Sequence, residues 1–288
     1  MANIKDLKIR IKSTKNTLKI TSAMKLVSAA KLSKAQGRIT NFKPYSSELD
    51  STVRMASLLV ENYTHEYLQK NNEAKKSVIL IVSSEKGLCG GYNSQLFKAV
   101  KNFTKNTEQE LEYHFIGKKV QALLKRDGIE STNKYEFAKA DPSFDEIKQI
   151  VTGLAQKFTK GEIANVYLAY NSFVSAIEFN SEVKQLLPMT EAEGSENKID
   201  TNMDFIYEPS AAKILDKLIP EVLNTTFYTC VLDAIAAEHG SRMTAMDNAT
   251  NNSKDMIKNL TLTANKLRQA AITTELTEIV SGAESLNS

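Results

Sequence analysis

The sequence predicts two long α-helices at the ends of the chain, which pair as an antiparallel coiled coil, and an open, Rossmann-like α/β domain inserted between them. Three observations support this fold class. Glycine and proline are scarce in both ends, apolar residues recur there with a coiled-coil period, and the middle alternates strand-like and helix-like segments. We therefore divide the chain into an N-terminal coiled-coil helix over 1–58, an α/β domain over 76–208 and a C-terminal coiled-coil helix over 209–288.

The N-terminal helix is predicted over about residues 3–58, a stretch with one glycine and one proline, Gly37 and Pro44. Steps of alternating three and four residues trace a coiled-coil seam on which eight of twelve positions are apolar. The seam positions are 4, 7, 11, 14, 18, 21, 25, 28, 32, 35, 39 and 42. Between 20 and 30 the apolar residues leave these positions, so we expect the contact face to rotate there.

The C-terminal helix is predicted over about residues 210–282 and keeps the same period, with twelve of twenty seam positions between Leu215 and Ser281 apolar. Pro220 lies near its start and favours a kink. At roughly 105 Å, such a helix is too long to pack wholly on a small domain. It needs a long partner, and the N-terminal helix of the same chain is the obvious one, so the two must run antiparallel. Polar residues interrupt the seam at Thr225, Thr229, His239, Thr250 and Ser253.

The middle of the chain reads as an α/β domain. Its first strand is a continuous apolar run, which is typical of a strand buried on both faces. The alternation of strands and helices predicts parallel pairing with an antiparallel edge, followed by a polar loop over 191–200. The expected strands are 77–83, 111–116, 163–170 and 176–187, and the expected helices are 94–103, 118–126 and 143–158.

Composition argues against several classes of function. The two cysteines, Cys89 and Cys230, are far apart, so a disulfide framework is not expected. The three histidines lack partners at metal-ligand spacing, and no apolar run approaches the roughly 20 residues that cross a bilayer. No nucleophile, base and acid stand out as a set. We therefore expect no catalytic residues, no bound cofactor and no metal.

A glycine-rich loop over 87–91 (GLCGG) joins a predicted strand to a predicted helix and invites a nucleotide-binding interpretation. Its spacing, however, matches neither the dinucleotide fingerprint nor the P-loop, and no Lys-Ser/Thr pair follows it. We expect the glycines to permit a tight turn and Cys89 to fill buried space. A small α/β nucleotide enzyme with helical extensions stays an alternative.

Positive charge is concentrated on the N-terminal helix. Residues 1–58 contain twelve Lys/Arg and three Asp/Glu, whereas 59–209 have a net charge of −4 and 210–288 of −2. A helix of this kind suits nucleic acid or an acidic protein surface, so a coiled-coil adaptor for nucleic acid is a second alternative. Phe42 and Tyr45 come late and are not interleaved with the cations, which disfavours a stacking platform for bases.

The end of the chain is unusual because it is apolar where termini are commonly polar. Ile272, Leu276, Ile279 and Val280 lie on one stripe of the predicted helix. An exposed helical tip should not have such a stripe unless another molecule surrounds it.

Three separate motifs resemble one known family. They are IRIKSTKNTLKITSAMKLV over 9–27, KGLCGGYN over 86–93 and RQAAITTELTEIVSGA over 268–283. Through them, and over its whole length, the chain resembles the gamma subunit of the F-type ATP synthase, bacterial type. That subunit is a central rotor shaft, an antiparallel pair of terminal helices with an α/β domain at its foot.

The resemblance implies a noncatalytic subunit of the ATP synthase. Its expected partners are the alpha and beta subunits of the alpha3-beta3 ring, the epsilon subunit and the c-ring, without nucleic acid. Ion flow through the c-ring would turn the shaft, and the shaft would drive ATP synthesis or hydrolysis at the beta subunits. Membrane association is expected only through the complex. Because the resemblance begins at about residue 3, with no transit segment ahead of it, we expect the cytoplasmic face of a bacterial inner membrane.

The resemblance also implies contact residues rather than catalytic ones. Met24 and Lys25 correspond to coupling contacts that face an acidic loop of the beta subunits, and Arg242 corresponds to a coupling position on the C-terminal helix. The apolar stripe acts as the bearing in the ring. Residues at or near the bearing and the beta catch loop are Arg268, Gln269, Thr273, Glu275, Leu276, Glu278, Ile279 and Val280.

Overall fold

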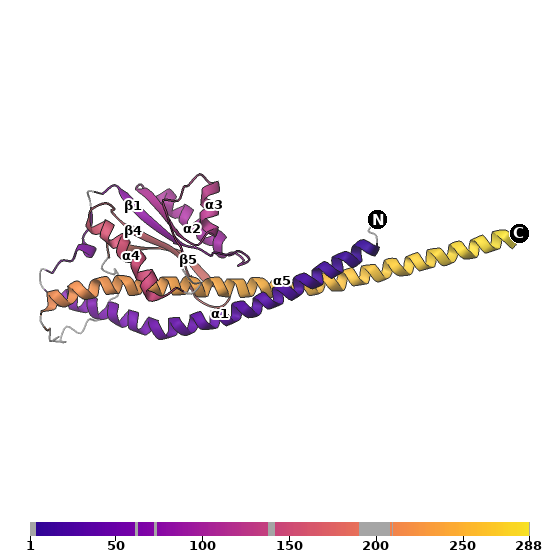
Figure 1. Cartoon of the computed structure of the whole chain (residues 1–288), viewed down its shortest axis with the longest axis horizontal. Helices are drawn as coiled ribbons and strands as arrows, with labels where there is room; N and C mark the ends of the chain where they lie inside the picture. The colour runs from indigo at the N-terminus through magenta and orange to yellow at the C-terminus, as the bar shows by residue number, and fades with distance from the viewer. Residues whose placement is uncertain are drawn as a thin grey trace. The chain divides into compact units, whose positions relative to one another are not determined.

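The computed structural model describes residues 4–60, 63–71, 74–137, 142–189, 208 and 210–287 (Figure 1). Its contacts divide the chain into two compact units. The first unit joins Met1–Ser28 to Arg242–Ser288, and the second is Ala29–Ser241. The predicted domains 1–58, 76–208 and 209–288 separate elements by type rather than by contact, and that division stays a prediction. The predicted polar loop over 191–200 lies outside the described residues.

The two long helices and the α/β arrangement agree with the predicted fold class. Helix α1 covers Ile4–Leu59 and contains Pro44, and helix α5 covers Ala211–Asn287 and contains Pro220. Each starts within a residue or two of its predicted start, although α5 continues past the predicted end at 282. The elements between them are the 3-10 helix η1 (Glu66–Leu68), β1 (Lys76–Val82), α2 (Tyr92–Asn106), β2 (Glu110–Ile116), α3 (Lys119–Arg126), β3 (Asn133–Tyr135), α4 (Phe144–Thr159), β4 (Val166–Phe173) and β5 (Phe179–Leu187).

A five-stranded sheet forms the centre of the second unit, in the order β3-β2-β1-β4-β5. Strand β1 pairs in parallel with both β2 and β4, and β2 pairs in parallel with β3. Strand β5 is antiparallel to β4 and forms one edge, as the sequence predicted. The other edge, β3, was not predicted, because its three residues contain no apolar run and depend on β2 for their pairing.

The apolar run of β1 supplies two cores because successive side chains point to opposite faces of the sheet. Val78, Leu80 and Val82 pack in one core with residues of α4 and α5. Ile79 and Ile81 pack in the other with residues of α2 and α3. Both faces of the sheet are therefore covered, which explains why this strand is apolar throughout rather than alternating.

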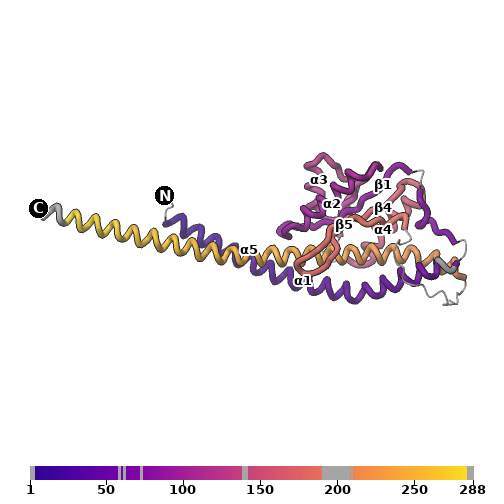
Figure 2. The backbone as a smooth tube through the Cα atoms, turned by 180° about the vertical axis from the view of Figure 1, so that it is seen from behind, coloured from indigo at the N-terminus to yellow at the C-terminus, as the bar shows by residue number. Residues whose placement is uncertain are grey.

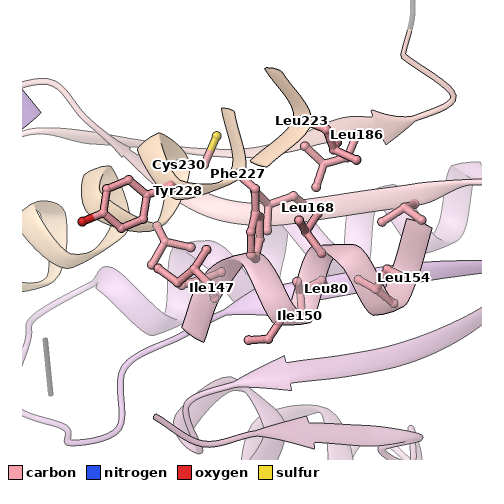
Figure 3. Close-up of a cluster of buried hydrophobic side chains, with 14 of the residues drawn as sticks. Leu80, Ile147, Ile150, Leu154, Leu168, Leu186, Leu223, Phe227, Tyr228 and Cys230 are labelled. Atoms are coloured by element: carbon pink, nitrogen blue, oxygen red, sulfur yellow. The ribbon is translucent and has the colours of Figure 1, made fainter. Parts of the chain in front are cut away.

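The core between the sheet and α4 includes part of the C-terminal helix (Figure 3). Leu80 and Leu168 come from the sheet, Ile147 and Leu154 from α4, and Phe227 from α5. All five are fully or almost fully buried. Helix α5 is thus a structural layer of the second unit.

Helix α4 begins where the sequence predicted, through a capping box. The Ser143 hydroxyl accepts a hydrogen bond from the backbone N–H of Glu146, and the Glu146 carboxylate accepts one from the backbone N–H of Ser143. Two otherwise unpaired N–H groups of the first turn are satisfied in this way.

Within the second unit, α1 and α5 pack against each other in opposite directions (Figure 1). Phe42 of α1 meets Tyr228 of α5, with ring centroids 4.8 Å apart. Further along α1, Val53 and Ala56 share a cluster with Ile219 of α5. Because residue numbers rise on one helix as they fall on the other, the pair is antiparallel here.

One segment of α5, residues 234–241, contacts the α/β elements through hydrogen bonds that each join a side-chain hydroxyl to a main-chain carbonyl. Tyr92 donates its phenolic hydrogen to the Ala234 carbonyl over 3.1 Å, and Ser241 donates to the Cys89 carbonyl over 2.6 Å. A Cβ placed on Gly240 would lie 3.0 Å from the carbonyl oxygen of Ala176 in the β4–β5 hairpin. Gly240 therefore permits a close approach that a side chain would obstruct.

Candidate partner-binding surface of the terminal helices

The first unit is an antiparallel pair formed by the start of α1 and the end of α5 (Figure 2). Lys25 Nζ lies 2.6 Å from Asp247 Oδ1, and the hydroxyl oxygens of Thr21 and Thr250 are 2.9 Å apart. Further out, Thr14 donates its hydroxyl hydrogen to the Met256 sulfur over 3.8 Å. These cross-helix contacts confirm the predicted antiparallel pairing and fix its register.

The predicted seam of α1 is correct in this unit, but its predicted rotation is wrong. All eight seam positions up to Ser28 are buried or half-buried, including Thr21 and Lys25. The seam stays in place because its polar residues are satisfied within the pair. The Thr21 hydroxyl donates to the Leu18 carbonyl, and Lys25 pairs with Asp247.

The apolar residues that suggested a rotation lie instead on the outer surface. Ile20, Leu26 and Val27 are 60%, 68% and 57% exposed. None of them occupies a seam position. The spacing of the seam in the sequence was therefore enough to identify them as an exposed apolar surface. Within the first unit, the same helix has six exposed Lys/Arg residues: Lys5, Lys8, Arg10, Lys12, Lys15 and Lys19. A surface of this composition suits an acidic protein partner with apolar side chains.

The predicted coupling residues occupy different environments. Met24 is half-buried on α1. Lys25 is also half-buried, and its pairing with Asp247 was not predicted, since it depends on the register of the two helices. Arg242 is buried on α5, with 8% of its surface exposed. Whether these three residues contact a partner stays a prediction.

The end of α5 continues past the start of α1 (Figure 2). Every side chain from Arg268 to Ala283 is exposed. The predicted apolar stripe is among them, with Ile272, Leu276, Ile279 and Val280 between 49% and 67% exposed. The helix is thus unpaired over these residues, about 24 Å at 1.5 Å per residue. An apolar stripe on an unpaired helix is the feature expected of a surface that another protein covers.

The residues predicted near the bearing lie apart from the predicted coupling residues Met24 and Lys25. Arg268, Gln269, Thr273, Glu275 and Glu278 lie with the apolar stripe on the unpaired end of α5. The group around Met24 and Lys25 lies near Asp247 instead. The two groups are separated by about 30 Å along α5.

Hydrogen bonds from flanking side chains hold the glycine-rich loop in a tight turn. Leu88 and Gly90 adopt left-handed backbone conformations, with φ of 62° and 56°. Cys89 is buried, and Asn93 donates hydrogen bonds to the Cys89 sulfur over 3.1 Å and to the Ser84 hydroxyl over 2.8 Å. This arrangement fits the tight turn and the buried cysteine that the sequence predicted.

In the part of the chain that the structure describes, no three His, Cys, Asp or Glu side chains are grouped closely enough to hold a metal ion. No helix in those residues combines the length and the apolar character of a membrane span.

Comparison with known proteins relates the whole chain to one family. The family model described as ATP synthase matches residues 3–286. The ATP synthase gamma chain of Bdellovibrio bacteriovorus is 38% identical over 295 residues, covering 99% of each chain. That of Christiangramia forsetii is 39% identical over 289 residues, covering 100% of each.

Solved structures share the fold. The central stalk and c-ring structure of the Tetrahymena thermophila mitochondrial ATP synthase contains a chain that matches with a TM-score of 0.60 and 24% identity, over 80% of this chain and 99% of that one. A chain of the Euglena gracilis mitochondrial ATP synthase matches with a TM-score of 0.69 and 15% identity, over 98% of this chain and 94% of that one.

Proposed function

Because the chain belongs to the ATP synthase family, as a gamma chain, we propose that it rotates inside the alpha3-beta3 ring and couples ion flow to ATP synthesis or hydrolysis. It is a noncatalytic subunit, whose work is to transmit torque. Its partners are the alpha and beta subunits, the epsilon subunit and the c-ring. It is a peripheral subunit on the cytoplasmic face of the bacterial inner membrane, held there by the complex.

The observation that carries this proposal is the unpaired, apolar end of α5. Exposed Leu276, Ile279 and Val280 cost free energy in water, and a surrounding protein sleeve removes that cost. The sleeve must also let the helix turn. A stripe of side chains on a smooth helix provides contact area without deep interlocking, which suits a bearing.

Rotation can change nucleotide affinity because the helix pair lacks threefold symmetry. A shaft of this kind inside a ring of three identical sites contacts each site differently at any moment. Each beta subunit then has its own conformational equilibrium, and its affinity for nucleotide follows from the differential contact free energy. As the shaft turns, every site passes through the same sequence of affinities.

The outer surface of α1 supplies the coupling contact in this proposal. Its exposed cations attract an acidic loop of the beta subunits, while Ile20, Leu26 and Val27 give that loop an apolar surface to rest on. Met24 lies at the edge of this surface, and Lys25 is positioned by Asp247. Arg242, buried on α5, is the proposed coupling position of the second helix.

Affinity purification of the tagged full-length chain from membranes tests the proposal directly. The expected result is a complex that contains the alpha, beta and epsilon subunits and the c-ring and that hydrolyses ATP. Recovery of the folded chain without an ATPase, or with nucleic acid as its main partner, would falsify the assignment.

Met24→Lys tests the coupling contact. The added cation lies beside Lys25 and changes the contact with the acidic loop, so ATP-driven ion pumping should fall severalfold while ATP hydrolysis by the assembled complex changes little. Gln36→Lys adds the same charge at an exposed position three turns further along α1 and serves as the control. Equal losses of assembled complex and of pumping in Met24→Lys would contradict a role in coupling.

A further inference from the structure

We propose that a cavity of the second unit, between α1, β5 and α5, binds a small organic anion with an apolar body. The cavity has a volume of about 300 Å³. This is the lower end of the range for small-molecule sites. None of the predicted partner-contact residues lines it, so the site is separate from the surfaces that the proposed rotor function uses.

Cations at the cavity supply the charge that an anion needs. Lys43 comes from α1 and Lys184 from β5, and neither forms a salt bridge with a described residue. A third cation, Arg54, is held in place by Asp50, whose Oδ2 lies 2.8 Å from the Arg54 Nε. Both lysines act electrostatically on Asp233, whose pKa they lower. When Asp233 is protonated, the two ammonium groups lose that charged partner, and a bound anion can take its place.

Apolar side chains form another part of the cavity lining. Leu186, Leu223 and Cys230 line it and are at least 96% buried (Figure 3). Hydroxyl groups from Ser46 and Thr226 also line it. A ligand that satisfies both kinds of surface has an anionic head for the lysines and a short apolar body for the leucines.

The protonation state of Asp233 on α5 makes anion binding in the cavity depend on pH. Burial raises the pKa of Asp233 to about 6, although the nearby Lys43 and Lys184 lower it and Glu182 raises it further. Below that pH the carboxyl group is protonated and can donate a hydrogen bond to an anion, whereas above it the carboxylate repels one. The titratable and charged groups around Asp233 are Lys43, Asp50 and Arg54 of α1, Tyr170 of β4, Glu182 and Lys184 of β5, and Cys230 of α5.

Two of these neighbours do not titrate in the range that matters. Burial raises the pKa of Cys230 to about 11 and also raises the pKa of Tyr170. Both stay protonated near neutral pH, so the change of charge at the cavity between pH 5 and 8 is mainly that of Asp233.

Calorimetric titration of the full-length chain with hexanesulfonate tests the proposal, since this probe keeps its charge over the whole pH range. We expect saturable binding of one molecule, about tenfold tighter near pH 5.5 than near pH 7.5. Inorganic sulfate has the anionic head without the apolar body and should bind at least about tenfold more weakly. The absence of saturable hexanesulfonate binding at both pH values overturns the proposal.

Variants identify the site. Replacing both Lys43 and Lys184 by Gln should weaken hexanesulfonate binding by about tenfold or more, whereas Lys98→Gln, on the exposed surface of α2, should leave it unchanged. Equal effects of the two changes mean nonspecific attraction to a basic chain and overturn the site.

Asp233→Asn provides the second, independent variant. Its amide keeps a hydrogen-bond donor at every pH, so binding near pH 7.5 should match that of the unmodified chain near pH 5.5 and should no longer depend on pH. This variant removes a buried charge and should fold at least as well as the unmodified chain. Retained pH dependence in Asp233→Asn places the site elsewhere and contradicts the proposal.

Discussion

His114 lies on strand β2 with 1% of its surface exposed. Its Nδ1 lies 3.0 Å from the Tyr135 hydroxyl oxygen, whereas its Nε2 has no hydrogen-bond partner among the described residues. Burial, aided by Lys157, lowers the pKa of His114 to about 4, and the opposing effect of Glu112 is smaller. A protonated His114 is therefore poorly accommodated in the folded state.

This lowered pKa predicts a pH dependence of stability. The unfolded chain takes up the proton near pH 6.5 and the folded chain only near pH 4, so the free energy of unfolding should fall as pH decreases between these values. Full loss amounts to roughly 3 kcal/mol. Asp233, with a raised pKa, acts in the opposite direction, so the two groups must be separated by mutation.

His114→Asn isolates the imidazole. Denaturant unfolding at several pH values should show the difference between this variant and the unmodified chain shrinking or reversing as the pH falls. His65→Asn is the comparison variant: His65 is only half-buried and burial lowers its pKa as well, so its effect should have the same sign and be smaller. A constant difference for His114→Asn across the range would contradict the assignment.

Gly240 makes a second prediction at the scale of one residue. In an open helix, replacing glycine by alanine stabilises by about 1 kcal/mol. Gly37 of α1 has nothing within 4 Å of its added Cβ, so Gly37→Ala should show this gain. Gly240→Ala should show no gain or a loss of about 1 kcal/mol, because its Cβ meets the Ala176 carbonyl. Equal increases in the free energy of unfolding for the two variants, measured with denaturant, would mean that the β4–β5 hairpin moves aside for the added Cβ without cost.

At the scale of elements, the polar residues of the seam determine how the terminal helices align. An apolar seam tolerates sliding by one turn, since one leucine can replace another. Thr21 with Thr250, and Lys25 with Asp247, match only in one register. Such pairs give up some hydrophobic stabilisation and fix the alignment, as single polar residues do in other coiled coils.

A cross-link tests this register. Thr21→Cys combined with Thr250→Cys should form a disulfide on mild oxidation, because hydroxyls 2.9 Å apart place the two backbones within the range that a disulfide bridges. Thr17→Cys combined with Thr250→Cys is displaced by one turn and should not form one. Mass spectrometry of the non-reduced chain distinguishes the two. Similar yields for both pairs would show that the helices slide.

The elements that the sequence predicts well are those whose signals are local. The capping box at Ser143 and Glu146 is contained in four residues, and the apolar run of β1 is continuous. Strand β3 is different, because its pairing with β2 supplies what its own residues lack. The prediction that the contact face of α1 rotates was wrong for a related reason. Polar seam residues are interpretable only once their partners on α5 are known.

At the scale of the whole molecule, one part of the candidate surface could be predicted from the sequence and another part could not. The stripe at the end of α5 could be predicted because its apolar residues recur within a few turns of one helix. The role of Lys25 could not, because its contact with Asp247 joins residues more than two hundred positions apart. The cavity around Asp233 combines residues from α1, β5 and α5 and has no sequence signal.

Truncation of α5 tests the surface at this scale. Ending the chain after Leu267 removes only residues that are exposed in the described part of the helix, so the isolated chain should keep its thermal midpoint within a few degrees. Assembly and coupling of the complex should be impaired, and ending the chain after Gly282 should impair them less, because the stripe is distributed. Equal impairment by the two truncations would place the essential contact in the last six residues.

The contacts of α5 over residues 234–241 have a mechanical consequence, because each hydrogen bond has a main-chain carbonyl as one partner. A contact between two side chains gives more under load, since both partners can change rotamer. The bonds from Tyr92 to the Ala234 carbonyl and from Ser241 to the Cys89 carbonyl end on backbone atoms, and Gly240 brings the hairpin against the helix itself. A turning force applied to the α/β elements is therefore passed to the backbone of α5 with little movement between the two.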